Sequence, residues 1–411
     1  MKLRALSSSE LAQRFRAVRG ATEQLAAPLS PEDFVVQSMP DASPTKWHLA
    51  HTSWFFETFV LEACVANYRS FHPQFRVLFN SYYEAVGPKH ARHERGMLSR
   101  PTVDEVMAYR RAIDDAIHAL LAQDESKWRQ VADRIELGLH HEQQHQELIL
   151  TDLQHALSLN PLKPIYTERG AQVAAAPEPQ RYAKFEGGIR EIGDAGEAFA
   201  FDNERPRHRV LIEPYELATR LVTAGEYIEF IEDGGYKRPE LWLSDGWATV
   251  QSQAWQAPLY WEARDREYVR YSLHGEIPIA NHEPVCNVSF YEADAFARWA
   301  ERRLPSEAEW ELAYADTSIT GQFMEEGRWT PRCTESGFGS AWVWTATPYI
   351  AYPGFRPEAG AIGEYNGKFM CNQIVLRGGS CFTPATHLRA TYRNFFPPSA
   401  RWQVSGIRLA K

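Results

Sequence analysis

Eight consecutive residues in the first half of the chain are dense in side chains that bind metals or move protons: His140-His141-Glu142-Gln143-Gln144-His145-Gln146-Glu147. The surrounding stretch, residues 133–159, has no proline and places its apolar residues at helical spacing, which predicts a long helix. Since positions four apart share a helix face, His141 and His145 should project together, with Glu147 at the edge of that face. Two imidazoles so placed can bind one metal ion. The alternative is a polar helix face without a ligand.

The same residues satisfy H-E-x-x-H, the signature of zinc metalloproteases, in which Glu142 would be the general base. That chemistry needs a third ligand downstream. The extended motif fails at Leu148, where it requires glycine, and Glu168 follows only after a proline-rich break. Zinc hydrolysis therefore stays open as a less favoured alternative.

A second source of ligands is the predicted helix over residues 46–65, which contains His48 and His51. Either histidine is a candidate third ligand. Three neutral imidazoles leave several coordination positions open, and such a site on Fe(II) can accept a thiolate, dioxygen and a further donor together. Imidazole binds zinc, copper, iron and nickel alike, so the ligand type does not choose the metal.

Four predicted helices must position these histidines. The ranges are 1–30, 46–65, 102–123 and 133–159. Pro28 and Pro31 end the first helix, and Thr102 with Glu105 forms a capping-box pattern at the start of the third. Long helices with long connections are typical of a bundle, whose interior is a usual place for a metal. The connection over residues 67–96 is aromatic and basic, and a loop of this length is usually functional.

The second half of the chain has a different texture. Prolines and small residues over 161–183 predict a linker, after which short apolar runs alternate with glycine-rich turns. Helices are predicted at 291–302 and 307–314 within an otherwise mixed α+β pattern. We therefore expect two domains, a helical bundle over residues 1–160 and an α+β domain over residues 184–411.

Bulk properties exclude several classes of function. At 411 residues the chain is long enough for two domains, and a formal charge of -9 argues against nucleic acid as a partner. The five cysteines form no CxxC pair, which favours a reducing cytoplasm. Neither a signal peptide nor an apolar run of membrane-spanning length is visible, so we expect a cytoplasmic protein without a membrane partner. The sequence leaves the oligomeric state open.

With these residues in view, Trp47-x-x-x-His51 followed by His141-x-x-x-His145-x-Glu147 resembles the DinB-type iron domain of the ergothioneine sulfoxide synthases, the EgtB group. The second half resembles their formylglycine-generating-enzyme-like domain, which is related to C-type lectins. The matching stretches are residues 187–188, 204–208, 222–223, 234–236, 284–299, 303–311, 377–380 and 406–409. The resemblance spans nearly the whole chain and both domains in this order.

The resemblance implies a chemistry. His51, His141 and His145 would hold a non-haem Fe(II), His48 would support or pack against the site, and His140 would be structural. In this family O2 couples a thiol sulfur to C2 of the imidazole of hercynine, which is Nα-trimethylhistidine, and also oxidises that sulfur. The product is a sulfoxide in ergothioneine biosynthesis.

The resemblance also implies how hercynine is bound. Gln144 and Glu147 occupy motif positions that hold the imidazole ring in the family. Asn394-Phe395-Phe396 matches a family segment that contacts the trimethylammonium group. That group has no N–H to donate, so aromatic faces and other electrostatic contacts must bind it.

Two further roles need residues. Tyr82 and Tyr83 match a subgroup in which a tyrosine pair lies near the iron, and a phenol there can donate a proton. Arg76 precedes this pair and is a candidate for the carboxylate of the thiol substrate, with Arg393 and Arg401 as weaker candidates. The family divides by thiol, and the segments over residues 79–83 and 395–403 look more like the cysteine-using branch.

Several alternatives remain. The thiol can be γ-glutamylcysteine, or the donor can be a selenosugar, as in a related branch. A zinc hydrolase or a DinB-type thiol transferase would share the histidine face. The second half can also be a separate binding module with a purely structural metal in the first.

Overall fold

The computed structural model describes residues 7–168, 170, 178–196, 198–265 and 267–411. The chain forms two compact units. Unit 1 comprises Met1–Asn160, Gly196–Phe199 and Pro357–Tyr365, and unit 2 comprises Pro161–Ala195, Ala200–Arg356 and Asn366–Lys411. Two short segments from beyond residue 160 therefore belong to the helical unit. The predicted linker over 161–183 falls partly, at residues 169 and 171–177, outside the described residues.

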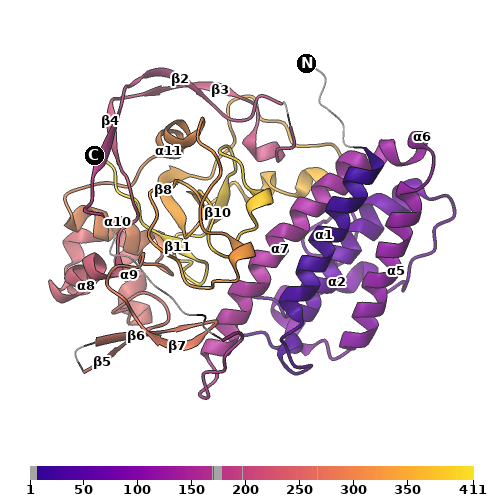
Figure 1. The fold of residues 1–411 in the computed structure, drawn as a ribbon, viewed down its shortest axis with the longest axis horizontal. Helices are drawn as coiled ribbons and strands as arrows, with labels where there is room; N and C mark the ends of the chain where they lie inside the picture. Colours follow the sequence, from indigo (N-terminus) through magenta and orange to yellow (C-terminus); the bar gives the residue numbers. More distant parts are fainter. Residues whose placement is uncertain (1–6, 169, 171–177, 197, 266) are drawn as a thin grey trace. The chain divides into compact units, whose positions relative to one another are not determined.

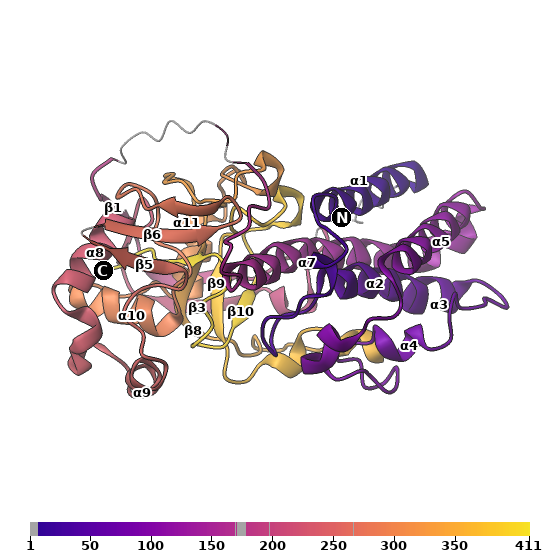
Figure 2. The ribbon, with the colours of Figure 1, turned by 90° about the horizontal axis from the view of Figure 1, so that it is seen from below.

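Unit 1 is helical, as the sequence predicts. Its helices are α1 (Ser8–Ala26), α2 (Thr45–Phe56), α3 (Glu62–Cys64), α4 (Phe75–Leu78), α5 (Val103–Leu121), α6 (Glu125–Trp128) and α7 (Ala132–Ser158). The long helices run alongside one another (Figures 1 and 2), and α1 and α2 both pack against α5 and α7. Apolar side chains at helical spacing fill the interior between them, among them Leu11, Phe15, Trp54, Ile113, Ile135 and Leu139.

The helix starts follow their sequence signals. Thr102 accepts a hydrogen bond from the backbone N–H of Glu105, whose side chain in turn accepts from the backbone N–H of Thr102, so the predicted capping box is confirmed. Ser7 and Glu10 form the same motif at the start of α1. These reciprocal bonds satisfy N–H groups that a helix start otherwise leaves unpaired.

The predicted helix over 46–65 is not one regular α-helix, which corrects the sequence analysis. After α2 the chain makes a π-helical turn, Glu57–Leu61, before α3. The buried carboxylate of Glu57 accepts hydrogen bonds from the hydroxyl of Tyr68 (3.0 Å), the backbone N–H of Phe71 (2.8 Å) and the hydroxyl of Tyr109. The turn is thereby tied both to the following loop and to α5.

Unit 2 is α+β, which confirms the predicted class. Its helices are α8 (Ala224–Glu232), α9 (Ser244–Gln253), α10 (Phe290–Trp299) and α11 (Glu307–Tyr314). Its strands are β1 (Tyr182–Phe185), β2 (Gly188–Ile192), β3 (His208–Ile212), β4 (Tyr215–Ala218), β5 (Trp261–Arg264), β6 (Glu267–Ser272), β7 (Gly275–Pro278), β8 (Trp342–Pro348), β9 (Ile374–Arg377), β10 (Asn394–Phe396) and β11 (Ser405–Gly406). The helices predicted at 291–302 and 307–314 are α10 and α11, whereas α8 and α9 were not predicted.

The largest described sheet of unit 2 has the order β10-β9-β8-β11, with β11 parallel to β8 and the other pairs antiparallel. Smaller antiparallel sheets pair β1 with β4, β2 with β3, and β6 with both β5 and β7. Strands this short form few backbone hydrogen bonds with one another. Side-chain ion pairs also contribute to the core of unit 2.

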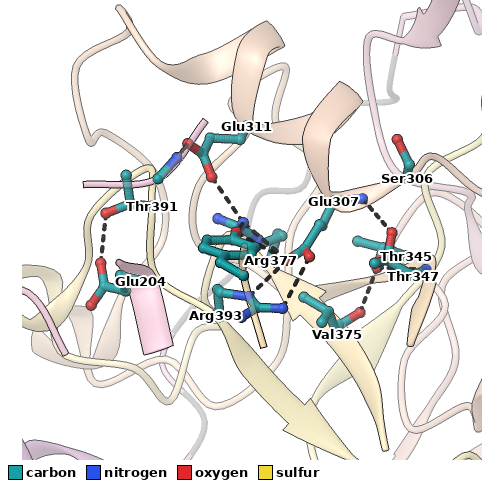
Figure 3. Close-up of polar contacts among 12 residues, drawn as sticks. Glu204, Ser306, Glu307, Glu311, Thr345, Thr347, Val375, Arg377, Thr391 and Arg393 are labelled. Carbon is teal, nitrogen blue, oxygen red and sulfur yellow. Dashed lines mark hydrogen bonds and ion pairs between the residues drawn. The ribbon is translucent and has the colours of Figure 1, made fainter. Parts of the chain in front are cut away.

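One buried ionic cluster joins α11 to β9 and to the residue before β10 (Figure 3). Arg377 donates to Glu311 at 2.9 Å and to Glu307 at 3.2 Å, and Arg393 donates to both oxygens of Glu307 at 2.9 and 3.0 Å. The two carboxylates balance the two guanidinium groups, which is what allows four charged side chains to remain in a dry interior.

Among the described residues, no helix has both the length and the apolarity that crossing a bilayer requires. All five cysteines are free thiols, and Cys286 and Cys381 are buried.

Candidate metal centre

Helices α2 and α7 bring three imidazoles together in the interior of unit 1. His51, His141 and His145 are all buried, and each offers a ring nitrogen such that these nitrogens lie within 4.8 Å of one another. Nε2 of His51 is 3.2 Å from Nε2 of His141. Metal–imidazole bonds are about 2.1 Å long, so two nitrogens at this separation can bind one ion. The spacing argument for His141 and His145 holds in the structure.

Hydrogen bonds decide between His48 and His51. The carbonyl of Phe79 accepts from Nδ1 of His51 at 2.6 Å, so the Nδ1 proton is fixed and the Nε2 lone pair faces the cluster. His48 instead lies 2.8 Å from Nδ1 of His145, through its own Nδ1, and 3.1 Å from Asp152 through Nε2. His48 therefore contacts a member of the triad rather than joining it.

Burial keeps the three imidazoles neutral. Loss of water is the main cause that lowers the pKa of His141 to about 3 and the pKa of His51 and His145 well below the ordinary value of 6.5. Neighbouring imidazoles lower the pKa of His51 and His145 further. Neutral rings present lone pairs, which is the form that binds metal.

Glu142 is not placed to act as a base. Its carboxylate is fully buried and accepts from Arg19 at 2.9 Å, Arg110 at 3.0 Å and Thr22 at 2.7 Å. Burial alone would raise the pKa of Glu142, but the two guanidinium groups outweigh it and lower the pKa to about 2. A permanently ionised carboxylate held by two cations is a poor general base, so the H-E-x-x-H interpretation loses its catalytic residue.

A cluster of three tyrosines lies beside the triad. The rings of Tyr82 and Tyr83 are 4.7 Å apart, Tyr365 lies 6.3 Å from Tyr82, and the ring of Tyr365 is 5.6 Å from that of His141. Burial, followed by the neighbouring tyrosines, raises the pKa of Tyr83 well above its ordinary value. Tyr83 therefore stays protonated. Sequence analysis missed Tyr365, because it lies 220 residues beyond His145 and no local pattern marks it.

Tyr365 also reaches a residue expected to bind substrate. Its hydroxyl donates to Oε1 of Gln144, one residue from His145 on α7. Glu147 is half-buried on the same helix. The neighbouring Glu364 accepts from the backbone N–H groups of Glu84 at 3.0 Å and Ala85 at 2.9 Å, which fixes the tyrosine loop to segment 357–365.

The cations near the site differ in their surroundings. Arg76 is exposed and pairs with Glu62 at 2.6 Å. Arg95, which sequence analysis did not single out, is buried with its guanidinium 3.4 Å from the ring centre of Trp47, and Trp47 stacks on His51 at 4.5 Å. Burial, followed by the charge of Arg92, lowers the pKa of Arg95 to about 8. Within the described residues no carboxylate forms an ion pair with Arg95.

The remaining predicted residues belong to unit 2. Asn394, Phe395 and Phe396 form β10 and are half-buried. Phe395 stacks on Tyr349 at 4.0 Å, and Phe396 packs edge-on against Trp402 at 5.5 Å. Arg393 and Arg401 are engaged by Glu307 and Glu292 respectively, so neither weaker candidate is an unpaired cation.

His140 has a packing role, in agreement with the sequence analysis. Its ring stacks on Phe199 at 4.0 Å and lies 3.4 Å from a guanidinium nitrogen of Arg14. Phe199 comes from the short segment 196–199, which belongs to unit 1.

Comparisons with known proteins match both halves of the chain. The DinB superfamily profile matches residues 14–149, and the profile of the sulfatase-modifying factor enzyme 1-like domain matches residues 172–337. Hercynine oxygenase of Mycobacterium tuberculosis is 29% identical over 98% of this chain and 99% of its own length. The proteins of the same name from Mycolicibacterium smegmatis and Mycolicibacterium thermoresistibile are 32% and 29% identical, over 67% and 90% of this chain and 71% and 88% of their lengths.

Proposed function

Because this chain belongs to the ergothioneine sulfoxide synthase family, whose members include the hercynine oxygenases, we propose that it joins the sulfur of cysteine to C2 of the hercynine imidazole. The reaction consumes one O2. An S–H and a C–H bond break, a C–S and an S–O bond form, and the second oxygen atom leaves as water. The four electrons that reduce O2 come from the thiol and the imidazole carbon.

The observation that carries this proposal is the buried triad of His51, His141 and His145, which no carboxylate joins among the residues that the structure describes. Three neutral donors leave room for both substrates and O2. Glu142, the residue that a hydrolase would need, is already bound by Arg19 and Arg110. The same geometry therefore supports an oxygenase and disfavours a zinc protease.

The resident metal in this proposal is Fe(II), held by His51, His141 and His145. Neutral, buried imidazoles suit iron among other metals. When bound, Fe(II) supplies the activation of O2 and a coordination position for the thiol sulfur. The protein's own residues must then orient hercynine, bind the thiol and deliver protons.

Hercynine orientation is assigned to the residues that the family resemblance implies, namely Gln144, Glu147, Asn394, Phe395 and Phe396. Gln144 and Glu147 lie on α7 beside the ligands, where they can hydrogen-bond the substrate imidazole. Since Tyr365 now donates to Gln144, the substrate would exchange with that contact. Asn394, Phe395 and Phe396 would contact the trimethylammonium group through aromatic and carbonyl electron density.

Proton delivery is assigned to the tyrosine cluster. Tyr82 and Tyr83 are the first candidates, and the contacts of Tyr365 with His141 and Gln144 make it a third. Burial keeps the Tyr83 phenol protonated at neutral pH, so the cluster can donate rather than accept. Loss of this donor should favour simple oxidation of the thiol.

Two cations are candidates for the thiol substrate's carboxylate. Arg76 follows from the sequence, but its contact with Glu62 must be exchanged first. Arg95 has the stronger physical case, because a buried guanidinium without a carboxylate partner among the described residues gains most from an incoming anion.

The test is to load the protein with Fe(II) and incubate it with hercynine and each donor in air: cysteine, γ-glutamylcysteine or a selenosugar. Oxygen uptake and the product mass are measured. We expect hercynylcysteine sulfoxide with cysteine. A γ-glutamyl or selenium product instead would correct the donor, and no coupled product with any donor would overturn the proposal.

A further inference from the structure

We propose that Asp152 and His48 form a proton-fixing chain that sets the tautomer of His145 and thereby presents its Nε2 lone pair to the metal. The inference rests on the proposed metal site but concerns different residues. The chain runs from Asp152 to His48 to His145, and all three side chains are buried. Helix α7 supplies both ends, seven residues apart on one face, and α2 supplies the middle.

The carboxylate of Asp152 determines which atom donates and which accepts in each hydrogen bond of this chain. Oδ2 of Asp152 can only accept, and it accepts from Nε2 of His48 at 3.1 Å and from the backbone N–H of Ser43 at 2.8 Å. In the tautomer of His48 that donates from Nε2, Nδ1 has a lone pair. That lone pair, 2.8 Å away, must accept from Nδ1–H of His145. The proton of His145 then lies on Nδ1, and Nε2 is left as a metal ligand.

Without Asp152, the opposite arrangement becomes available. His48 could carry its proton on Nδ1, which would turn a donor toward His145. Nδ1 of His145 would then have to accept, and its proton would move to Nε2, where it would block the metal. Asp152 is therefore a positioning residue that acts on the metal through His48. Asp152 is itself held by the Ser43 backbone N–H, so the chain begins at a fixed point.

The tautomer of His51 is set by a single direct hydrogen bond. Its Nδ1 proton is fixed directly by the carbonyl of Phe79 at 2.6 Å. A backbone carbonyl cannot change its role, so His51 needs no further support. His145 depends instead on the His48 side chain, which can donate or accept at Nδ1, so a substitution at Asp152, two contacts away, can change the tautomer of His145.

Two substitutions of His48 separate acceptor chemistry from packing. His48→Leu removes the acceptor, whereas His48→Asn places an amide oxygen near the position of Nδ1. Loss of such an outer hydrogen bond typically weakens metal binding roughly 10–100-fold. We expect His48→Leu to weaken Co(II) binding by that factor and to alter the Co(II) visible spectrum, and we expect His48→Asn to recover most of the affinity.

The metal probe is Co(II) alone, titrated into the full-length metal-free protein against a competing chelator. His155→Ala is the matched control, because His155 lies on α7 and bonds Ser38 outside the chain. It should leave Co(II) affinity unchanged. A folded His48→Leu protein with wild-type affinity and spectrum would overturn the inference.

A direct readout covers the case in which His48→Leu does not fold. Ring ¹⁵N spectra of histidine-labelled wild-type protein report which nitrogen of His145 carries the proton. We expect Nδ1, and a proton on Nε2 in the metal-free protein would contradict the chain. Wild-type protein that binds Co(II) but forms no sulfoxide would instead reject the proposed function and leave this inference standing.

Discussion

The carboxylate of Glu142 accepts hydrogen bonds from two arginines and a threonine on two other helices. Arg19 and Thr22 lie on α1, and Arg110 lies on α5. Removing one member of such a buried group leaves the remaining charges without compensation, which costs about 3–5 kcal/mol. We expect Glu142→Ala to lower the melting temperature of the full chain by roughly 10 °C, as measured by calorimetry.

Glu136→Ala is the matched control for this substitution, since Glu136 lies on the same helix and pairs with the partly exposed Arg14. Surface pairs of this kind contribute about 0–1 kcal/mol, so its melting temperature should barely change. If Glu142 were a general base, a Glu142 variant would lose activity while keeping its stability. Normal melting with lost turnover would therefore favour the hydrolase interpretation.

Substitutions in the tyrosine cluster should change which product forms rather than the stability of the protein. Tyr82→Phe, Tyr83→Phe and Tyr365→Phe each remove one phenolic proton. The variant that removes the donor should still consume O2 but form cysteine sulfinate in place of sulfoxide. A general acid contributes about 10²–10⁴-fold, so we expect the sulfinate-to-sulfoxide ratio to rise by at least about tenfold.

Mass spectrometry of the products measures this ratio. Tyr68→Phe serves as the control, because Tyr68 is a loop tyrosine whose hydroxyl bonds Glu57 rather than the cluster. Unchanged ratios in all three cluster variants would mean that another group delivers the proton.

For single residues, reasoning from the sequence without the family resemblance was informative only where helical spacing fixes the direction of a side chain. His141 and His145 are four apart on one helix, so their common face was predictable. Spacing did not choose between His48 and His51, because the contacts that distinguish them, Phe79 and Asp152, come from segments far away in the sequence. Only the family resemblance favoured His51. Tyr365 and Gln144 are 221 positions apart in the sequence, and no local sequence pattern predicts their contact.

Among the elements, segment 357–365 is attached to the tyrosine loop through the side chain of Glu364. Glu364 accepts from two consecutive backbone N–H groups of the tyrosine loop, those of Glu84 and Ala85. Charge-assisted bonds to a carboxylate are roughly twice as strong as neutral ones. We expect Glu364→Ala to release the loop and raise the sulfinate fraction severalfold, with Glu364→Gln intermediate, because an amide keeps one accepting oxygen.

Glu358→Ala is the control, since Glu358 is an exposed residue of the same segment. Hydrogen exchange of the peptide covering residues 81–87 provides a second readout. Faster exchange there in Glu364→Ala, without a change in products, would show that the Glu364 hydrogen bonds order the loop but do not control proton delivery.

Element boundaries were predictable where a local signal sets them. Thr102 and Glu105 mark the start of α5, and the predicted and observed helices agree. The π-helical turn at Glu57–Leu61 was missed because its cause is tertiary. Glu57 bonds Tyr68, Phe71 and Tyr109, of which Tyr109 belongs to another helix, and periodicity cannot reveal such a partner.

At the scale of the whole molecule, the two units have separate polar cores. The Arg19–Arg110–Glu142 group belongs to unit 1, and the cluster of Figure 3 belongs to unit 2. The change of texture near residue 160 was visible in the sequence. The return of residues 196–199 and 357–365 to unit 1 was not, because each is a short polar or irregular segment without periodicity.

This separation predicts that stability and metal affinity can be changed independently. Glu307→Ala removes the carboxylate that binds Arg377 and Arg393. Among the described residues, Arg377 then keeps Glu311, whereas Arg393 loses its carboxylate partner. We expect a loss of about 3–5 kcal/mol in the stability of unit 2 and a lower melting temperature. His51, His141 and His145, the proposed ligands, lie entirely in unit 1, so Co(II) affinity at 25 °C should match that of the wild type. A parallel loss of Co(II) affinity in the still folded variant would contradict this independence.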